Sequence, residues 1–146
     1  MKPISYALQF RGVASPVADG ILRAETRAPS TRFVTKVGPD GLSSLVESAD
    51  GDDASFESEV RFSDESTFVE AGTIQFGRSN ALRFHTVGVG VLESSPDPHL
   101  KHGTVMWEVE GGEGQFAGAT GRITSNFFVS DTGEVTDNHY GVIWIA

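Results

Sequence analysis

Five glycines fall within residues 111–121, where they are interleaved with Phe116 and two alanines. Glycine inside regular structure costs stability, so such a cluster is typical of backbone that needs a positive φ or a very close approach. A strand-like run flanks the cluster on either side. The sequence therefore predicts a compact connection between two strands, which points to a small antiparallel β-barrel. Barrels of this kind often hold a small molecule.

Apolar and polar side chains alternate along most of the chain. In residues 55–62, Phe56 and Phe62 lie on one phase and Glu57 and Glu59 on the other. A period of two is typical of a strand with one buried and one solvated face. Short polar turns separate the successive runs, which favours an antiparallel meander over parallel βαβ units.

These patterns predict an all-β fold, a single antiparallel β-barrel of about eight strands that forms one domain over residues 1–146. Closing the sheet into a barrel removes its exposed edges. One segment is ambiguous, because Leu42, Leu45, Val46 and Ala49 have the spacing of one face of a helix and equally allow a short strand.

The composition excludes several kinds of site and partner. Cysteine is absent from the 146 residues, which excludes disulfides, thiolate nucleophiles and cysteine-based zinc sites. The formal net charge of −9, from 20 acidic and 11 basic residues, repels phosphate backbones, so we expect no nucleic acid partner. Gln9 and Arg11 interrupt the apolar residues near the N-terminus, and no apolar run is long enough to cross a bilayer. We therefore expect a cytoplasmic protein without a membrane partner.

Residues 111–123 read Gly-Gly-Glu-Gly-Gln-Phe-Ala-Gly-Ala-Thr-Gly-Arg-Ile, and a strand, a Gly-Glu hairpin and a last hydrophobic strand follow. This segment resembles the C-terminal signature of the allene oxide cyclase and dirigent barrels, Gly-Gly-x-Gly-x-Phe-x-x-Ala-x-Gly. The resemblance covers about the last third of the chain, from Trp107 to Ile145. It implies an eight-stranded calycin-like barrel with an apolar cavity, often a dimer or trimer. Such barrels bind a reactive hydrophobic molecule and guide its cyclisation, isomerisation or coupling. The motif carries no catalytic residue, so none is transferred.

Glu70 is the first candidate for a catalytic group. It shares a strand phase with Phe68, Ile74 and Phe76. If that phase points inward, burial raises the pKa of its carboxyl group, as a general acid or base near neutral pH requires. The alternative is a strand that twists or bulges at Gly72 and leaves Glu70 in water.

Two histidines are the other catalytic candidates. His85 shares a phase with several valines, and His139 shares one with Val135 and Ile143. A buried imidazole can move protons near neutral pH, and Asp137 is placed to orient His139 along the same face. The alternative for each is a structural histidine that bonds a backbone carbonyl or lies at the barrel mouth.

Four residues are expected to contact the substrate, namely Phe84, Trp107, Asn126 and Tyr140. The amide of Asn126 and the hydroxyl of Tyr140 could bond a substrate carbonyl or an ordered water. All of these placements depend on which strand phase faces inward, because a shift of one residue inverts the lining.

Two further clusters admit a functional and a structural interpretation. Glu108 and Glu110 lie on one face of a strand, where paired carboxylates could split their pKa values, but a solvated outer face is favoured. His99 and His102, with Asp97, are close enough to share a metal ion. They lie in a proline-broken loop without a full ligand set, so we expect an exposed loop and no metal site.

The resulting hypothesis is a small, cofactor-free barrel enzyme that acts on a hydrophobic small molecule by isomerisation, cyclisation or hydration/elimination. No cofactor is expected, because the formal dinucleotide fingerprint at residues 112–117 is followed by a strand rather than a helix. One alternative is a binding or carrier barrel without turnover, and another is a packed structural barrel that acts through its surface. A homo-oligomer, either dimer or trimer, is expected.

Overall fold

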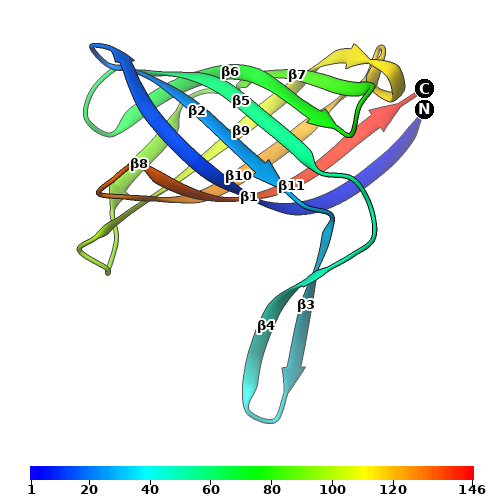
Figure 1. The fold of residues 1–146 in the computed structure, drawn as a ribbon, viewed down its shortest axis with the longest axis horizontal. Helices are drawn as coiled ribbons and strands as arrows, with labels where there is room; N and C mark the ends of the chain where they lie inside the picture. Colours follow the sequence, from blue (N-terminus) through cyan, green and yellow to red (C-terminus); the bar gives the residue numbers. More distant parts are fainter.

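Eight strands follow one another around a closed antiparallel barrel in the computed structural model, which describes all of residues 1–146 (Figure 1). In order around the barrel they are β1 (Lys2–Ala18), β2 (Ile21–Ala28), β5 (Ala54–Phe62), β6 (Thr67–Phe76), β7 (Asn80–Thr86), β9 (Leu100–Glu113), β10 (Thr120–Ser130) and β11 (Glu134–Ile145). The barrel closes where β11 pairs with β1. The prediction of an all-β antiparallel barrel is confirmed.

One additional strand, β8 (Gly90–Ser94), completes the wall beyond β7. It pairs with β6 through Phe68 and Gly90, and with β9 through Val91 and Thr104. β7 pairs with the same two strands nearer their other ends. Together β7 and β8 therefore fill one position between β6 and β9, interrupted by residues 87–89.

The ambiguous segment around residue 45 is a strand. β3 (Thr31–Gly38) and β4 (Gly41–Ser48) form a two-stranded hairpin that projects from the barrel (Figure 1). Every residue of β4 is exposed, so the helical spacing of its apolar residues finds nothing to pack against. Cross-strand pairing with β3 is what stabilises the extended form instead.

The glycine-rich stretch is the compact connection that its composition predicts. β9 runs into a short 3₁₀ helix, η1 (Gly114–Phe116), before β10 begins. Gly111, Gly114 and Gly118 have φ values of 76°, 62° and 71°, which other residues rarely adopt. This turn places Phe116 inside the barrel end, where its ring packs 5.3 Å from that of Phe76. The connection therefore closes one end of the barrel.

Large side chains fill the middle of the barrel. The ring of Phe56 stacks on Phe84 at 5.4 Å, and the ring of Phe84 lies 4.5 Å from that of Trp107. Phe10 and Ile74 are fully buried beside them. This part of the interior is packed, so any internal space must lie toward the ends. The structure contains no helix with the length and apolarity needed to cross a membrane.

Candidate functional site

Glu70 is anchored inside the barrel by two hydrogen bonds. β5 and β6 pair so that Val60 lies opposite Glu70 and Ser58 opposite Gly72, which points Ser58 and Glu70 into the interior. The Ser58 hydroxyl donates to Glu70 Oε2 at 2.7 Å. From β9, the indole Nε1–H of Trp107 donates to Glu70 Oε1 at 3.1 Å. Both carboxyl oxygens therefore have a fixed partner.

A second buried carboxyl group, Asp137, comes from β11. The Ser125 hydroxyl of β10 donates to Asp137 Oδ1 at 2.5 Å, and Nε2 of His139 lies 2.9 Å from Asp137 Oδ2. With Asp137 ionised, Nε2 must carry the hydrogen of this bond. The other ring nitrogen, Nδ1, is buried without a partner. The imidazole packs on Phe10 at 4.2 Å and meets Trp107 edge-on at 4.9 Å.

Burial and neighbouring groups shift the pKa of Glu70. The pKa of Glu70 rises from 4.5 to about 7, chiefly because burial removes water from the carboxylate. The hydrogen bond from Ser58 opposes this rise, the negative charge of Asp137 adds to it, and the bond from Trp107 opposes it more weakly. Glu70 therefore binds and releases a proton near neutral pH, which a general acid–base group requires.

Above these groups lies a cavity of about 90 Å³. Its floor includes Glu70, Asp137, Ser125 and Thr26. Its walls are mainly apolar, with contributions from Leu22, Val60, Phe62, Phe68, Leu92, Phe127 and Val129. Several wall residues are only half-buried, so the cavity opens at the end of the barrel opposite the glycine-rich connection. The hydroxyl of Thr26 is buried without a hydrogen-bond partner. Thr26 of β2 pairs with Phe56 of β5.

The cavity is small compared with typical ligand pockets. Pockets for drug-sized ligands measure ~300–1,000 Å³, and an engineered cavity of ~150 Å³ holds benzene. A cavity of about 90 Å³ encloses only a few heavy atoms. A larger molecule would extend its remaining atoms through the open end. The described site therefore suits a small molecule, or the end of a longer one.

Four of the seven residues predicted for the site point into the barrel. Glu70 lines the cavity. His139, Trp107 and Phe84 are also inside the barrel, at 2%, 1% and 1% exposure, but they lie beneath the cavity floor in the packed core. His139 reaches the floor only through Asp137, and Trp107 only through Glu70.

The other three predicted residues are outside the barrel, so their expected place in its lining is wrong. His85 follows the inward Phe84 and points outward, where it contacts Glu108 and Glu110. Asn126 and Tyr140 also point outward, because each follows an inward residue on its strand. Asn126 is exposed on β10, and Tyr140 is 55% exposed on β11. For Asn126 and Tyr140, both phases of the strand carry apolar residues, so alternation does not show which phase is inside. The valines in phase with His85 lie beyond β7, which ends at Thr86, so they do not show where His85 points.

Several floor residues were not predicted as site residues. Ser58, Ser125 and Thr26 are small polar residues at inward positions of otherwise apolar phases, and the sequence pattern assigns Asp137 only the role of a partner to His139. The available signal was the phase itself: Ser58 alternates in step with Phe56 and Val60. A polar residue at an apolar-phase position is the pattern that would have found them.

Both outer clusters are exposed to solvent. Glu108 and Glu110 lie on the solvated face of β9. His99 is 83% exposed in the loop between β8 and β9. No group of three or more histidine, aspartate or glutamate residues is arranged to hold a metal ion.

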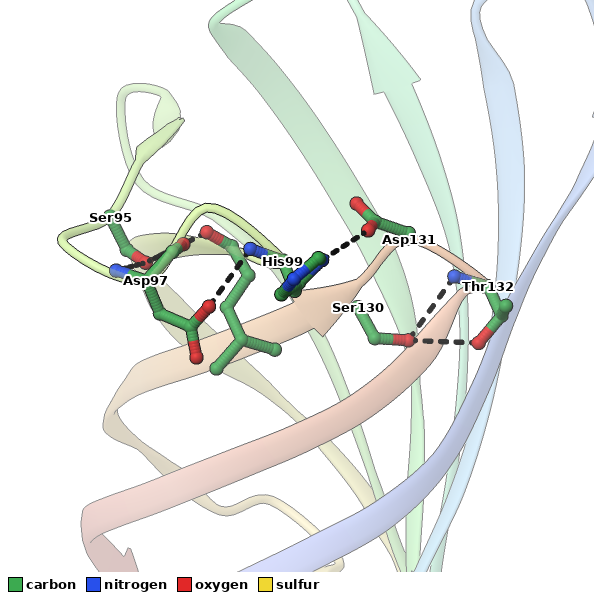
Figure 2. A network of polar contacts seen from close by, with 7 residues as sticks. Ser95, Asp97, His99, Ser130, Asp131 and Thr132 are labelled. Atoms are coloured by element: carbon green, nitrogen blue, oxygen red, sulfur yellow. Dashed lines mark hydrogen bonds and ion pairs between the residues drawn. The ribbon is translucent and has the colours of Figure 1, made fainter.

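An exposed polar network joins two connections beside the open end of the barrel (Figure 2). The backbone N–H of His99 donates to Asp97 Oδ1 at 2.9 Å, and His99 Nδ1 lies 3.2 Å from Asp131 Oδ2. On the Asp131 side, the Ser130 hydroxyl oxygen accepts the N–H of Thr132 at 3.3 Å. This network therefore links the β8–β9 loop to the β10–β11 turn.

Replacing Asp131 by asparagine should change the free energy of unfolding by less than about 1 kcal/mol, because exposed ion pairs are well screened by water. The side chains of His99 and Asp131 are 83% and 71% exposed. Urea denaturation of the two proteins would test this. A loss well above that amount would mean that the loop contact holds the barrel end together.

The chain matches no protein-family model, no curated protein and no solved structure. Of what the resemblance to allene oxide cyclase and dirigent barrels implies, the structure shows the closed eight-stranded antiparallel barrel. Membership of that family has no support beyond the motif itself.

Proposed function

We propose that this protein is a cofactor-free enzyme that moves a proton on a small apolar molecule bound in the end cavity, as in an isomerisation. One observation carries the proposal: a carboxyl group with a pKa of about 7, Glu70, lies at the floor of a cavity with apolar walls. Proton transfer is fastest when the pKa of the catalytic group is close to the working pH. The apolar walls would hold the body of the substrate and keep water away from the carboxyl group.

A β,γ-unsaturated ketone is the substrate class that fits these groups. The Glu70 carboxylate removes a proton from the carbon between the carbonyl group and the double bond, and the C–H electron pair forms the enolate. The hydroxyl of Thr26, which is buried and unpaired, donates to the enolate oxygen. The Glu70 carboxylic acid then returns the proton to the far alkene carbon, and the double bond moves into conjugation. No oxidant, reductant or metal is required.

Asp137 would support this cycle without touching the transferred proton. Its negative charge raises the pKa of Glu70, which makes the Glu70 carboxylate a stronger base. The same charge stabilises the protonated form of Glu70 while the substrate is an enolate. Ser125 and His139 hold the Asp137 carboxylate in place by hydrogen bonds. Asp137 is therefore proposed as a group that tunes the base, and His139 as a positioning residue.

The test uses allyl methyl ketone, a six-heavy-atom probe whose isomerised product absorbs in the ultraviolet. We expect the protein to exchange the acidic hydrogens of the probe with deuterium from solvent and to form the conjugated ketone. Glu70→Gln should slow both by about 100-fold or more, the usual contribution of a general acid–base group. NMR follows the exchange, and Glu113→Gln, which removes an exposed carboxylate, is the control. If the wild type exchanges the hydrogens of the probe no faster than a free carboxylate at equal concentration, the proposed enzymatic activity is refuted.

A carrier without turnover is the second candidate, and one observation favours it. Both oxygens of Glu70 already accept hydrogen bonds from Ser58 and Trp107, as expected of a fixed binding floor. A carrier predicts that the ketone probe binds, as shown by chemical-shift changes in the cavity residues, without deuterium exchange. Glu70→Gln would then change the affinity alone. If no shift occurs in the cavity residues, both candidates fail for this class of molecule.

A further inference from the structure

Two arginines face each other on the outside of the barrel wall. β1 and β2 pair so that Arg11 lies directly opposite Arg27, and both residues are exposed. This is the only position in either sheet where two basic residues are paired across strands. Like charges directly opposite each other on neighbouring strands are destabilising. Folding alone therefore does not favour this arrangement.

The contacts of the two arginines leave most of their positive charge unbalanced. Arg11 Nη2 donates to Gln9 Oε1 at 3.3 Å, and Gln9 Nε2 in turn donates to Asn138 Oδ1 at 3.0 Å. These neutral partners position the Arg11 side chain without balancing its charge. Arg27 Nη2 lies 3.7 Å from Asp53 Oδ2, and both of these side chains are more than half exposed. Water screens such an ion pair, so it is weak.

The two arginines line an open hollow of about 600 Å³ in the outer wall. The hollow extends over β1, β2, β5 and β6, which are successive strands of the barrel (Figure 1). Short side chains at the half-buried Ser55 and Thr73, next to the long arginine side chains, leave this space open. Ser55 pairs with Arg27 and so continues the row that Arg11 begins. Its hydroxyl supplies a neutral donor beside the guanidinium groups.

The acidic residues of the hollow lie in the next row. There Glu25 of β2 is paired with Glu57 of β5. Arg23 binds both carboxylates, with Nε 2.8 Å from Glu25 Oε1 and Nη2 2.9 Å from Glu57 Oε2. One cation thus holds two glutamates, and one negative charge remains in that row. The hollow therefore has a positive side at Arg11 and Arg27 and a weakly negative side, so an anionic group fits only over the arginine pair.

We propose that Arg11 and Arg27 bind a phosphate group, either free or as an ester of a small molecule. A phosphate carries close to two negative charges near neutral pH, which match the two guanidinium groups, and its oxygens fit their planar sets of N–H donors. A carboxylate has one charge and would leave one arginine unbalanced. Bound phosphate would also remove the repulsion between Arg11 and Arg27. The net charge of −9 still opposes a polyanion such as nucleic acid. The site lies outside the barrel, so the inference is independent of the proposed reaction.

Titration of the full chain with inorganic phosphate tests the site, with chloride used to hold the ionic strength constant. NMR follows the arginine Nε–H signals. We expect saturable shifts of Arg11 and Arg27 at millimolar phosphate. Arg11→Gln should weaken binding by about tenfold or more, since it removes a charge-assisted hydrogen-bonding group. Arg61→Gln is the matched control, because Arg61 is ion-paired with Glu59 outside the hollow, and should bind phosphate as the wild type does.

Asp53→Asn should have the opposite effect and strengthen phosphate binding severalfold, because it removes the carboxylate that competes for Arg27. Glu113→Gln removes the same charge outside the hollow and should change the affinity less. The melting temperature in chloride checks folding. It should not fall in Arg11→Gln, where the repulsion with Arg27 is relieved.

Three results would overturn the proposal. The first is the absence of saturable shifts, and the second is an equal loss of affinity in Arg11→Gln and Arg61→Gln, which would indicate general charge screening. The third is acetate binding as tightly as phosphate, which would assign the arginine pair to carboxylates. If the proposal holds, phenyl phosphate distinguishes the two sources of the group. Tighter binding than inorganic phosphate identifies an ester whose body lies in the hollow, and weaker binding identifies free phosphate.

Discussion

Glu70→Gln should make the folded protein more stable than the wild type above pH 7, by up to about 3 kcal/mol, while leaving it little changed below pH 4.5. Burial raises the pKa of Glu70 from 4.5 to about 7 in the folded state. Below pH 4.5 both the folded and the unfolded chain hold the proton, so the wild type has its full stability. Between pH 4.5 and 7 the unfolded chain releases the proton and the folded chain retains it, so stability falls. Above pH 7 the loss is complete, and the shift corresponds to about 3 kcal/mol.

Glutamine removes this loss because it never ionises. Its amide can still accept a hydrogen bond from Ser58 or Trp107, so the interior keeps a partner for those donors. Urea denaturation between pH 4 and pH 9, followed by tryptophan fluorescence, measures the difference between variant and wild type. Glu113→Gln corrects for the change in net charge.

The pH dependence of the stability difference between variant and wild type shows whether the pKa of Glu70 is raised in the folded state. A rise between pH 4.5 and 7 shows that Glu70 is protonated at neutral pH in the folded state. A flat difference would mean that water reaches the carboxyl group. In that case the proposed reaction would lose the base on which it rests, even if the barrel binds the ketone probe.

Gly72→Ala should cost about 3 kcal/mol or more and should abolish folding at moderate temperature. A Cβ atom at Gly72 would lie 2.1 Å from the backbone oxygen of Glu57 and 2.8 Å from the Cα of Ser58. Both are backbone atoms of the neighbouring strand β5, so a side-chain rotation does not relieve the clash. The strands would have to separate where Ser58 pairs with Gly72, which breaks ladder hydrogen bonds and moves Ser58 away from Glu70.

Gly38→Ala is the matched control for this prediction. Gly38 has an ordinary φ, and a Cβ added there meets no atom within 4 Å. The variant should therefore be neutral or slightly more stable, by up to about 1 kcal/mol, because alanine restricts the unfolded chain. Thermal unfolding of both variants measures the contrast. A Gly72→Ala protein with an unchanged melting temperature would contradict the close strand approach.

Much of the fold followed from local pattern, and the candidate site followed only in part. Alternation and turn residues predict the strands, and the glycines of residues 111–121 predict a tight connection, because both features depend on neighbours in the chain. Glu70 was found for the same reason, since its phase is clearly apolar on one side. Asn126 and Tyr140 were misplaced because their strands carry apolar residues on both phases, so alternation does not say which phase is inside.

Local sequence is enough to specify antiparallel strands joined by short turns, with a glycine-rich connection before the last two. Those properties arise from local backbone sterics and from side-chain alternation. Which faces point inward depends on the closed barrel, because closure selects one phase of each strand at once. Closure also places Glu70 and Asp137, distant in the chain, on one desolvated floor beneath an open apolar cavity. The burial of Glu70 and the effect of the Asp137 charge on its pKa exist only after the barrel has closed.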